Sequence, residues 1–356
     1  MIQPSALIKE TQKLEDRLSK ITLPPELKTK ALEMIRRLSL MVEHQGYSAE
    51  FDRTSNYLDW IISLPWTKQS HDRLDLKIAR EILDKHHYGM DQVKEKIIEY
   101  LAVLSLISQR QENLSSDSKA SRAPILCLVG LVGTGKTTFG PSLAEAMQRQ
   151  YVRIPFGGLG SARDLRGQSR LHQDAEPGLI IKALRKAQTK NPIFLLDEID
   201  RVTVDAQADI MGVLVELLDS EQNSQFIDHY IDYPVDLSNV LFIVTANNTR
   251  NIATAVLDRL EVIQMPSYTD SEKITIAKNY VLPNTLKESG LTNDNLTIND
   301  DVWPKIVRPL GFDAGIRTLE RTIKGVCHKI AKLVVEGQTK HIHLTLENIK
   351  NYLPDY

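Results

Sequence analysis

Cysteine is scarce in this sequence, which has two among its 356 residues. Cys127 and Cys327 lie in apolar segments far apart along the chain, so buried thiols in a reducing compartment are a better interpretation than a disulfide or a metal site. The nine histidines show no spacing typical of metal ligands. The sequence therefore points away from a disulfide framework and from a metal centre built on histidine and cysteine.

Long apolar runs and an excess of one charge are also missing. No stretch approaches the roughly 18 consecutive apolar residues of a membrane span, and the first residues lack the apolar core of a signal peptide. The formal net charge is −2, so bulk charge gives no argument for a nucleic-acid partner. With 42% hydrophobic and 25% charged residues, we expect a soluble cytoplasmic enzyme of two or three domains, without a membrane partner.

A glycine-rich segment, Gly130–Thr137, follows the apolar run Ile125–Val129 and precedes a stretch compatible with a helix. The pattern G-x-x-x-x-G-K-[ST] in this setting is typical of a phosphate-binding (Walker A) loop. Backbone N–H groups curl round the phosphates, Lys136 neutralises the β and γ oxygens, and the Thr137 hydroxyl is placed for Mg²⁺. A glycine-rich turn of no chemical consequence is the alternative, and it leaves Lys136 without a role. The predicted nucleotide-binding residues of the loop are Gly130, Gly133, Thr134, Gly135, Lys136, Thr137 and Thr138.

A second apolar strand ends in two adjacent carboxylates, Asp197 and Glu198. Such a strand is buried in a parallel sheet. At its carboxyl end Asp197 can reach Mg²⁺ through water, and Glu198 can polarise the water that attacks the γ-phosphate. Acidic residues at strand ends are usually only solvated, but in combination with the loop they predict hydrolysis of ATP or GTP.

Four regions follow one another along the chain. Residues 1–112 are expected to be a helical segment, 113–123 a Ser- and Asp-rich linker, 124–268 an α/β domain with a parallel sheet, and 269–356 a small helical domain. The expected strands of the α/β domain are Ile125–Val129, Tyr151–Ile154, Ile193–Leu196, Val240–Thr245 and Glu261–Met265. In the last domain we expect the longest helix between Asp313 and Glu336 and a short strand at His341–Leu344.

Several short sequence segments resemble those of a known family. They include Asn56–Trp60, Leu64–Trp66, His87–Gly89, Glu99–Val103, Asn191-Pro192, Glu221–Asn223, Thr245–Asn247, Leu257–Arg259, Gly315–Arg317 and Leu319–Arg321. Over nearly its whole length the sequence resembles the AAA+ ATPase module of Lon-type ATP-dependent proteases. The resemblance implies an AAA+ P-loop NTPase large domain, a small helical lid after it, a helical segment before it, ATP with Mg²⁺, and a homo-hexameric ring around a pore.

The resemblance also implies roles for further residues. Asn247 matches sensor 1, which holds the attacking water, although an asparagine that satisfies a loop backbone is the alternative. Arg259 matches the arginine finger that reaches a neighbouring subunit, and a surface salt bridge with a residue such as Asp258 or Glu261 is its alternative. Arg317 matches sensor 2 in the lid, and it could instead be an ordinary arginine on a helix surface. Positions near the adenine, which could equally be domain-interface packing, are Tyr88, Gly89, Tyr268 and Ile276.

Two departures from the family pattern bear on function. Between Arg166-Gly167 and Pro177-Gly178 the family places a Tyr-Ile-Gly pore loop that grips unfolded polypeptide, whereas this chain has His172, Gln173 and Asp174. We therefore expect weaker threading, although a divergent loop that still threads stays open. The chain also ends about where the peptidase domain of the family begins, so the Ser-Lys dyad is expected to be absent. The substrate-recognition domain that usually precedes these helices in the family is likewise expected to be absent from this chain. An expressed fragment, a natural protease-less paralogue and one product of a split enzyme all fit.

Three hypotheses for function follow. The first is an ATP-hydrolysing Lon-type module that acts on protein substrates, alone or with a peptidase or a full-length relative supplied elsewhere. The second is a nucleotide-gated scaffold or regulatory subunit that does not thread its substrates. The third, a nucleic-acid-remodelling AAA+ protein, is disfavoured by the near-neutral charge and the absence of a basic run with interleaved aromatic residues.

Overall fold

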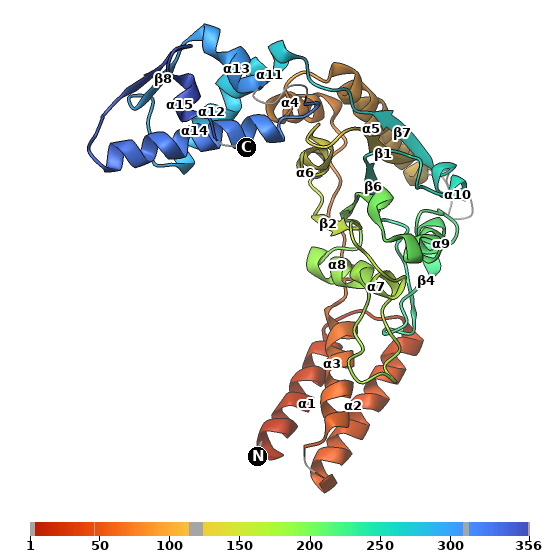
Figure 1. Ribbon diagram of the computed structural model, residues 1–356. Coiled ribbons are helices and arrows are strands. Elements are labelled where there is room, and N and C mark those ends of the chain that lie inside the picture. The colour runs from red at the N-terminus through yellow and green to blue at the C-terminus, as the bar shows by residue number, and fades with distance from the viewer. Residues whose placement is uncertain (1–3, 46, 114–123, 309–312, 355–356) are drawn as a thin grey trace.

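The computed structural model describes residues 4–45, 47–113, 124–308 and 313–354. A helical bundle projects from one end of the molecule, a parallel sheet with its helices lies in the middle, and a small mostly helical unit lies at the other end (Figure 1). Of the predicted linker, residues 114–123 lie outside the described residues. Among the described residues, no helix combines the length and apolar character needed to cross a bilayer.

The bundle consists of three helices, α1 (Pro4–Ser19), α2 (Pro25–Gln45) and α3 (Ala49–Ser63). Pro25 begins α2, where a missing backbone N–H costs nothing, and the Ser48 hydroxyl caps α3 by accepting from the Phe51 N–H at 3.1 Å. Most apolar positions at helix-face spacing in α1 and α2 are buried, but Leu32 is 44% exposed, and Ala31 at the preceding position is buried in its place. The buried set includes Leu7, Leu14, Leu18, Ile35, Leu38 and Val42.

Helix α3 ties this bundle to the sheet region through polar contacts. The Tyr57 hydroxyl donates to the Ile231 carbonyl at 2.9 Å, and the Arg170 guanidinium stacks 3.7 Å from the Tyr57 ring centre. Asp59 accepts hydrogen bonds from both Arg17 of α1, at 2.7 Å, and Arg185, at 2.5 Å. The bundle is therefore joined to the rest of the molecule by paired charges and a buried ring, as well as by apolar packing.

The central sheet has five parallel strands within the described residues, in the order β2-β3-β6-β1-β7. The predicted strands are confirmed to within one residue at each end. Their bounds are β1 (Ile125–Val129), β2 (Tyr151–Pro155), β3 (Ile193–Asp197), β6 (Leu241–Ala246) and β7 (Leu260–Gln264). Because parallel strands point the same way, the ends of β1, β3 and β6 meet at one edge of the sheet, where Val129 pairs with Ala246 and Leu196 with Val244.

Alternating side chains of each strand enter two different cores. Leu126, Leu128 and Ile193 pack against α4 (Leu76–His86), α5 (Asp91–Asn113) and α6 (Lys136–Met147). Cys127 and Phe194 pack on the opposite face, against α7 (Arg163–Arg166), α8 (Leu179–Ala187) and α9 (Gln207–Leu217), in a core continuous with the bundle. Helices α4 and α5 thus cover one face of the sheet. The hairpin β4 (Phe226–Ile227) with β5 (Pro234–Val235) and the helix α10 (Thr254–Leu257) complete this region.

The unit after β7 has its own apolar core. It begins with a capping box, in which Thr269 and Glu272 satisfy each other's backbone N–H groups at the start of α11. Its elements are α11 (Asp270–Ile276), α12 (Leu282–Glu288), β8 (Leu296–Ile298), α13 (Trp303–Val307), α14 (Arg317–Val335), β9 (Ile342–Leu344) and α15 (Ile349–Tyr352). Both cysteines are buried free thiols, as predicted, and burial raises the pKa of Cys127 to about 12 and that of Cys327 to about 11.

Candidate nucleotide-binding site

The glycine-rich loop Gly130–Thr137 joins the end of β1 to the start of α6. Gly133 has a φ of +82° and Gly135 a φ of +88°, a left-handed conformation that residues with a Cβ rarely adopt. The Thr134 hydroxyl donates to the Leu131 carbonyl at 2.8 Å, and the Thr138 hydroxyl to the Gly135 carbonyl at 2.6 Å. The loop is therefore shaped by its own contacts, with the N-terminus of a twelve-residue helix behind it.

The Lys136 side chain is buried within this loop, at 6% exposure. Its ammonium donates to the carbonyls of Gly130 at 2.6 Å and Leu131 at 2.8 Å, and to Oδ1 of Asn247 at 3.1 Å. Burial lowers the pKa of Lys136, whereas the neighbouring acids, Glu198 first among them, act to raise it. A phosphate oxygen in the loop would give this ammonium a charged acceptor in place of neutral carbonyls.

Both acids at the end of β3 are held by one hydroxyl, that of Thr245 on β6. It donates to Oδ1 of Asp197 at 2.5 Å and accepts from the Glu198 N–H at 2.9 Å. Asp197 is 1% exposed and also accepts from Nε of Arg153 at 2.7 Å. Glu198 turns off the strand with a φ of +58°, which costs about 1–2 kcal/mol for a residue with a Cβ. The adjacent acids therefore have different surroundings, since the Glu198 side chain is 27% exposed.

Asn247 follows β6 and faces the loop. Its backbone N–H donates to Oδ1 of Asp200 at 3.1 Å. Asp200 is itself buried, at 6% exposure. The side-chain Nδ2 is buried and has no hydrogen-bond partner among the described residues. Asn247 does not satisfy a loop backbone with its side chain, as the alternative interpretation requires, and an unpaired buried donor of this kind is costly unless a ligand completes it. Sequence reasoning missed Thr245, Asp200 and Arg153 as the residues that hold this constellation.

The unit that follows the sheet touches the phosphate loop directly. The Ile316 N–H donates to the Gly133 carbonyl at 3.0 Å, and Arg317, the first residue of α14, lies beside Gly133. A Cβ on Gly315 would lie 2.5 Å from the Gly133 carbonyl carbon. The contact between the two units therefore requires glycine at position 315.

We expect Gly315→Ala to separate these two units and to weaken nucleotide binding and turnover. Real Cβ atoms essentially never approach backbone to 2.5 Å, and Gly133 cannot retreat without deforming the loop. We expect a loss of about tenfold or more, in line with the 1–3 kcal/mol typical of overpacking. The measurement is the dissociation constant for ATP, with Gly212→Ala as the control, because a Cβ there meets no atom within 4 Å. An unchanged constant for Gly315→Ala would contradict the required close contact.

A cavity of about 550 Å³ opens beside the loop, between the sheet region and the unit that follows it. Tyr88, Tyr268 and Ile276, three of the four predicted adenine-site residues, line it together with Gly135 and Thr138 of the loop. Gly89 is next to Tyr88 in the chain and is not among the lining residues. Sequence reasoning missed Tyr280, whose ring lies 6.4 Å from that of Tyr88.

His87 also lines this cavity, and its ring stacks 3.8 Å from that of Phe139. Its Nε2 is 2.9 Å from the Ser142 hydroxyl, and burial lowers the pKa of His87 to about 4. The ring is therefore neutral near pH 7. Burial likewise raises the pKa of Tyr268 to about 12, so the walls of the cavity carry no charge from either ring.

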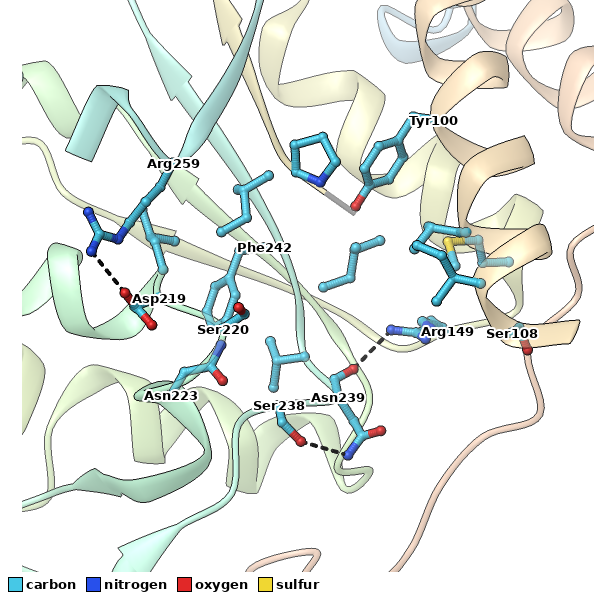
Figure 2. Close-up of a pocket in the computed structure, with 18 of the residues that line it drawn as sticks. Tyr100, Ser108, Arg149, Asp219, Ser220, Asn223, Ser238, Asn239, Phe242 and Arg259 are labelled. Carbon is cyan, nitrogen blue, oxygen red and sulfur yellow. Dashed lines mark hydrogen bonds and ion pairs between the residues drawn. The ribbon is translucent and has the colours of Figure 1, made fainter. Parts of the chain in front are cut away.

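Arg259 lies at the opposite edge of the sheet. It precedes Leu260, which pairs with Ile125 at the start of β1, whereas the phosphate loop follows the end of β1. Five residues of strand separate the two edges, a length of roughly 16 Å. Arg259 donates to Oδ2 of Asp219 at 2.8 Å and to the Ala255 carbonyl at 2.6 Å, beside a cavity of about 740 Å³ (Figure 2). Arg259 therefore forms a salt bridge within its own chain, as the alternative interpretation describes, but its partner is Asp219 and not one of the neighbouring acids Asp258 and Glu261.

The loop between α7 and α8 carries His172, Gln173 and Asp174, all exposed. Its base is pinned by buried Asp228, which accepts from the Gly178 N–H at 2.7 Å and from the N–H groups of Tyr230 and Ile231. Burial raises the pKa of Asp228, and these hydrogen bonds oppose the shift. Leu171, next to the polar triplet, is 93% exposed, so the loop presents one apolar side chain that sequence reasoning did not single out.

Comparison with known proteins agrees with this arrangement. Residues 126–268 match the ATPase family associated with various cellular activities (AAA), and residues 287–342 match the Lon protease AAA+ ATPase lid domain. A Lon protease of Desulforamulus reducens is 44% identical over 336 residues, which cover 94% of this chain and 40% of that protein. A Lon protease of Dictyoglomus thermophilum is 44% identical over 345 residues, which cover 97% of this chain and 42% of that protein. Lon protease 1 of Bacillus subtilis is 40% identical over 344 residues, which cover 97% of this chain and 43% of that protein.

The chain thus spans about two fifths of the length of these relatives. The AAA match covers the sheet with its phosphate loop and acids, and the lid match covers most of the unit that closes on the loop. The chain therefore belongs to the AAA+ ATPases, as an ATPase module of the Lon type.

Proposed function

We propose that this chain binds ATP with Mg²⁺ between its α/β domain and its lid, and hydrolyses it. The observation that carries the proposal is the meeting of Lys136, Asn247 and the Asp197-Glu198 pair at one edge of the sheet, with the buried Nδ2 of Asn247 left without a partner. A γ-phosphate or its attacking water is the kind of acceptor that would complete this donor. We assign Gly89 no role in binding the adenine, because it does not line the cavity.

Each polar group has a distinct task in this proposal. Lys136 neutralises phosphate charge, Asn247 Nδ2 orients the water, and the partly exposed carboxylate of Glu198 accepts its proton. Asp197 and Thr137 would hold Mg²⁺, which neutralises phosphate charge when it is bound. Among the described residues no cluster of three His, Cys, Asp or Glu side chains can hold a metal, and a site that shares its ligands with nucleotide phosphates is typical of Mg²⁺. Arg317 would connect the position of the lid to the γ-phosphate.

A neighbouring protomer completes the site in our proposal. Arg259 lies at the edge of the sheet away from its own phosphate loop, so it can act on a nucleotide only in another copy. We propose a homo-hexameric ring that acts on protein substrates, since the relatives that match are named Lon proteases. The exposed polar triplet His172–Asp174 favours a second candidate, a nucleotide-gated scaffold or regulatory subunit that assembles without threading polypeptide.

The deciding experiment is steady-state ATP hydrolysis by the purified chain across a range of protein concentrations, with and without unfolded casein. Turnover that rises with both protein concentration and casein supports a ring that engages polypeptide. Turnover that rises with concentration and ignores casein supports the scaffold. A complete lack of turnover under all these conditions would contradict an ATPase that is complete in this chain.

We expect Lys136→Ala to weaken ATP binding by about 10- to 100-fold, because a hydrogen bond to a charged group contributes about 1.5–3 kcal/mol. The dissociation constant of ATP is the measurement. Lys13→Ala, on the exposed face of α1, is the matched control and should bind ATP as the unmodified chain does. Equal affinities for the two variants would contradict the phosphate-loop assignment.

A further inference from the structure

We propose that Asp219 is a positioning residue for Arg259 and holds the guanidinium in the orientation in which it meets the nucleotide of a neighbouring protomer. The inference rests on the proposed role of Arg259 and adds a residue to that site. Asp219 follows α9, forty residues before Arg259 in the chain. Nothing in its local sequence pattern indicates this partnership.

The carboxylate of Asp219 is held in place by hydrogen bonds that do not involve Arg259. Its Oδ1 accepts from the N–H groups of Glu221 at 2.9 Å and Gln222 at 3.2 Å. The backbone is held as well, since the Asn223 N–H donates to the Asp219 carbonyl at 2.9 Å. Oδ2 is thereby directed at Arg259. The hydrogen bond from Arg259 lowers the pKa of Asp219, so the carboxylate is charged near neutral pH.

Arg259 uses only part of its hydrogen-bonding capacity in these contacts. Of the five N–H donors of a guanidinium, one pairs with Asp219 Oδ2 and one with the Ala255 carbonyl. The side chain is 28% exposed and that of Asp219 is 20% exposed, so the remaining donors are accessible from the cavity. A planar group held on one side by a carboxylate and a carbonyl can offer its other side to a phosphate.

Two further acids that line the cavity, Asp258 and Asp72, are not ion-paired with Arg259 among the described residues. Asp258 is adjacent to Arg259 in the chain and lines the same cavity, but no ion pair joins the two within the described residues. Asp72 accepts from Nε of Arg149 at 2.8 Å. The Arg149 guanidinium also donates to the Asn239 carbonyl at 3.1 Å (Figure 2). The two arginines therefore have separate partners, and Arg259 depends on Asp219.

The energetic reason for such a partner is preorganisation. A free arginine side chain loses conformational freedom when it is immobilised, and without a partner this loss would add to the activation barrier. Holding the group in advance removes that cost from the barrier, and small misplacements of a reacting group can lower rates by about 10²-fold. Asp219 therefore acts on turnover and leaves the ATP affinity of its own protomer unchanged.

The test compares Asp219→Ala, Asp219→Asn and the control Asp258→Ala, each alone and in the Arg259→Ala background. We expect Asp219→Ala to lower kcat by about 10- to 100-fold with the dissociation constant for ATP unchanged, and Asp258→Ala to behave as the unmodified chain. Asp219→Asn should lose a similar amount although it keeps the shape of the side chain, because its single acceptor oxygen can serve either the N–H groups of Glu221 and Gln222 or Arg259, but not both. In the Arg259→Ala background, Asp219→Ala should cause no further loss, since residues that act as a unit are not additive.

Two results would overturn the inference. One is a kcat for Asp219→Ala equal to or above that of the unmodified chain, which would make the ion pair dispensable or inhibitory. The other is a loss of the same size with and without Arg259, which would mean that Asp219 acts through the fold. Full turnover by Arg259→Ala alone would instead contradict the proposed trans role of Arg259, so the two failures are distinguishable.

Discussion

Replacement of Glu198 by glutamine is expected to leave ATP bound and to lower turnover by about 10²–10⁴-fold, the usual contribution of a positioned general base. The amide has the shape of the carboxylate but cannot take a proton from the attacking water. The groups that hold the nucleotide are untouched, because Lys136 donates to the loop and to Asn247 and makes no hydrogen bond with Glu198 among the described residues. The backbone N–H of residue 198 would still donate to Thr245.

The measurement pairs a dissociation constant for ATP with the rate of phosphate release at saturating ATP. Glu347→Gln, at an exposed position of the lid, makes the same chemical change away from the site and should leave both values unchanged. Phosphate release by Glu198→Gln at the rate of the unmodified chain would remove Glu198 from the mechanism.

Arg259→Ala is expected to lower turnover by about 10³–10⁵-fold, the range in which an arginine finger acts, while each protomer retains its ATP. Binding survives because Arg259 lies at the amino edge of the sheet, one strand length away from the phosphate loop of its own chain. Turnover fails because the neighbouring nucleotide loses a positive charge opposite the γ-phosphate. Arg36→Ala, on the exposed face of α2, is the matched control and should keep full turnover.

Mixing variants tests the geometry directly. Arg259→Ala protomers have an intact Glu198, and Glu198→Gln protomers have an intact Arg259. If the two residues act across an interface, a mixture of these two inactive variants should regain part of the activity at the sites where the intact residues meet. A mixture as inactive as its components, from variants that assemble together, would place both residues in one protomer.

Much of the fold could be predicted from sequence, because buried parallel strands are short apolar runs with clear ends. The runs beginning at Ile125 and Ile193 match β1 and β3 closely. The packing of α4 and α5 over the sheet could not be predicted, since helical periodicity indicates that one face is buried without indicating what buries it. Leu32 is exposed for a related reason, because Ala31 occupies the inward position one residue earlier.

The candidate site also has parts that could be predicted from sequence and parts that could not. The phosphate loop and the Asp-Glu pair are local patterns, and they could be identified from neighbouring residues alone. Thr245 contacts Asp197, which lies 48 positions earlier in the sequence. This contact could not be predicted, because no local sequence pattern indicates which residue a hydroxyl at the end of a strand will contact. Sequence suggests nearby acids such as Asp258 and Glu261 as partners for Arg259, and it does not indicate Asp219, which lies forty residues earlier in the chain and follows α9.

The anchoring of α3 has a mechanical consequence. Tyr57 and Asp59 join the bundle to the sheet region, so a rotation of that region carries the bundle with it as a lever. Helix α2 has 21 residues, a length of roughly 31 Å, and a rotation of about 10° at its base would sweep its far end through about 5 Å. A rotation of that size in the sheet region would thus displace the tip of the bundle by about one helical turn.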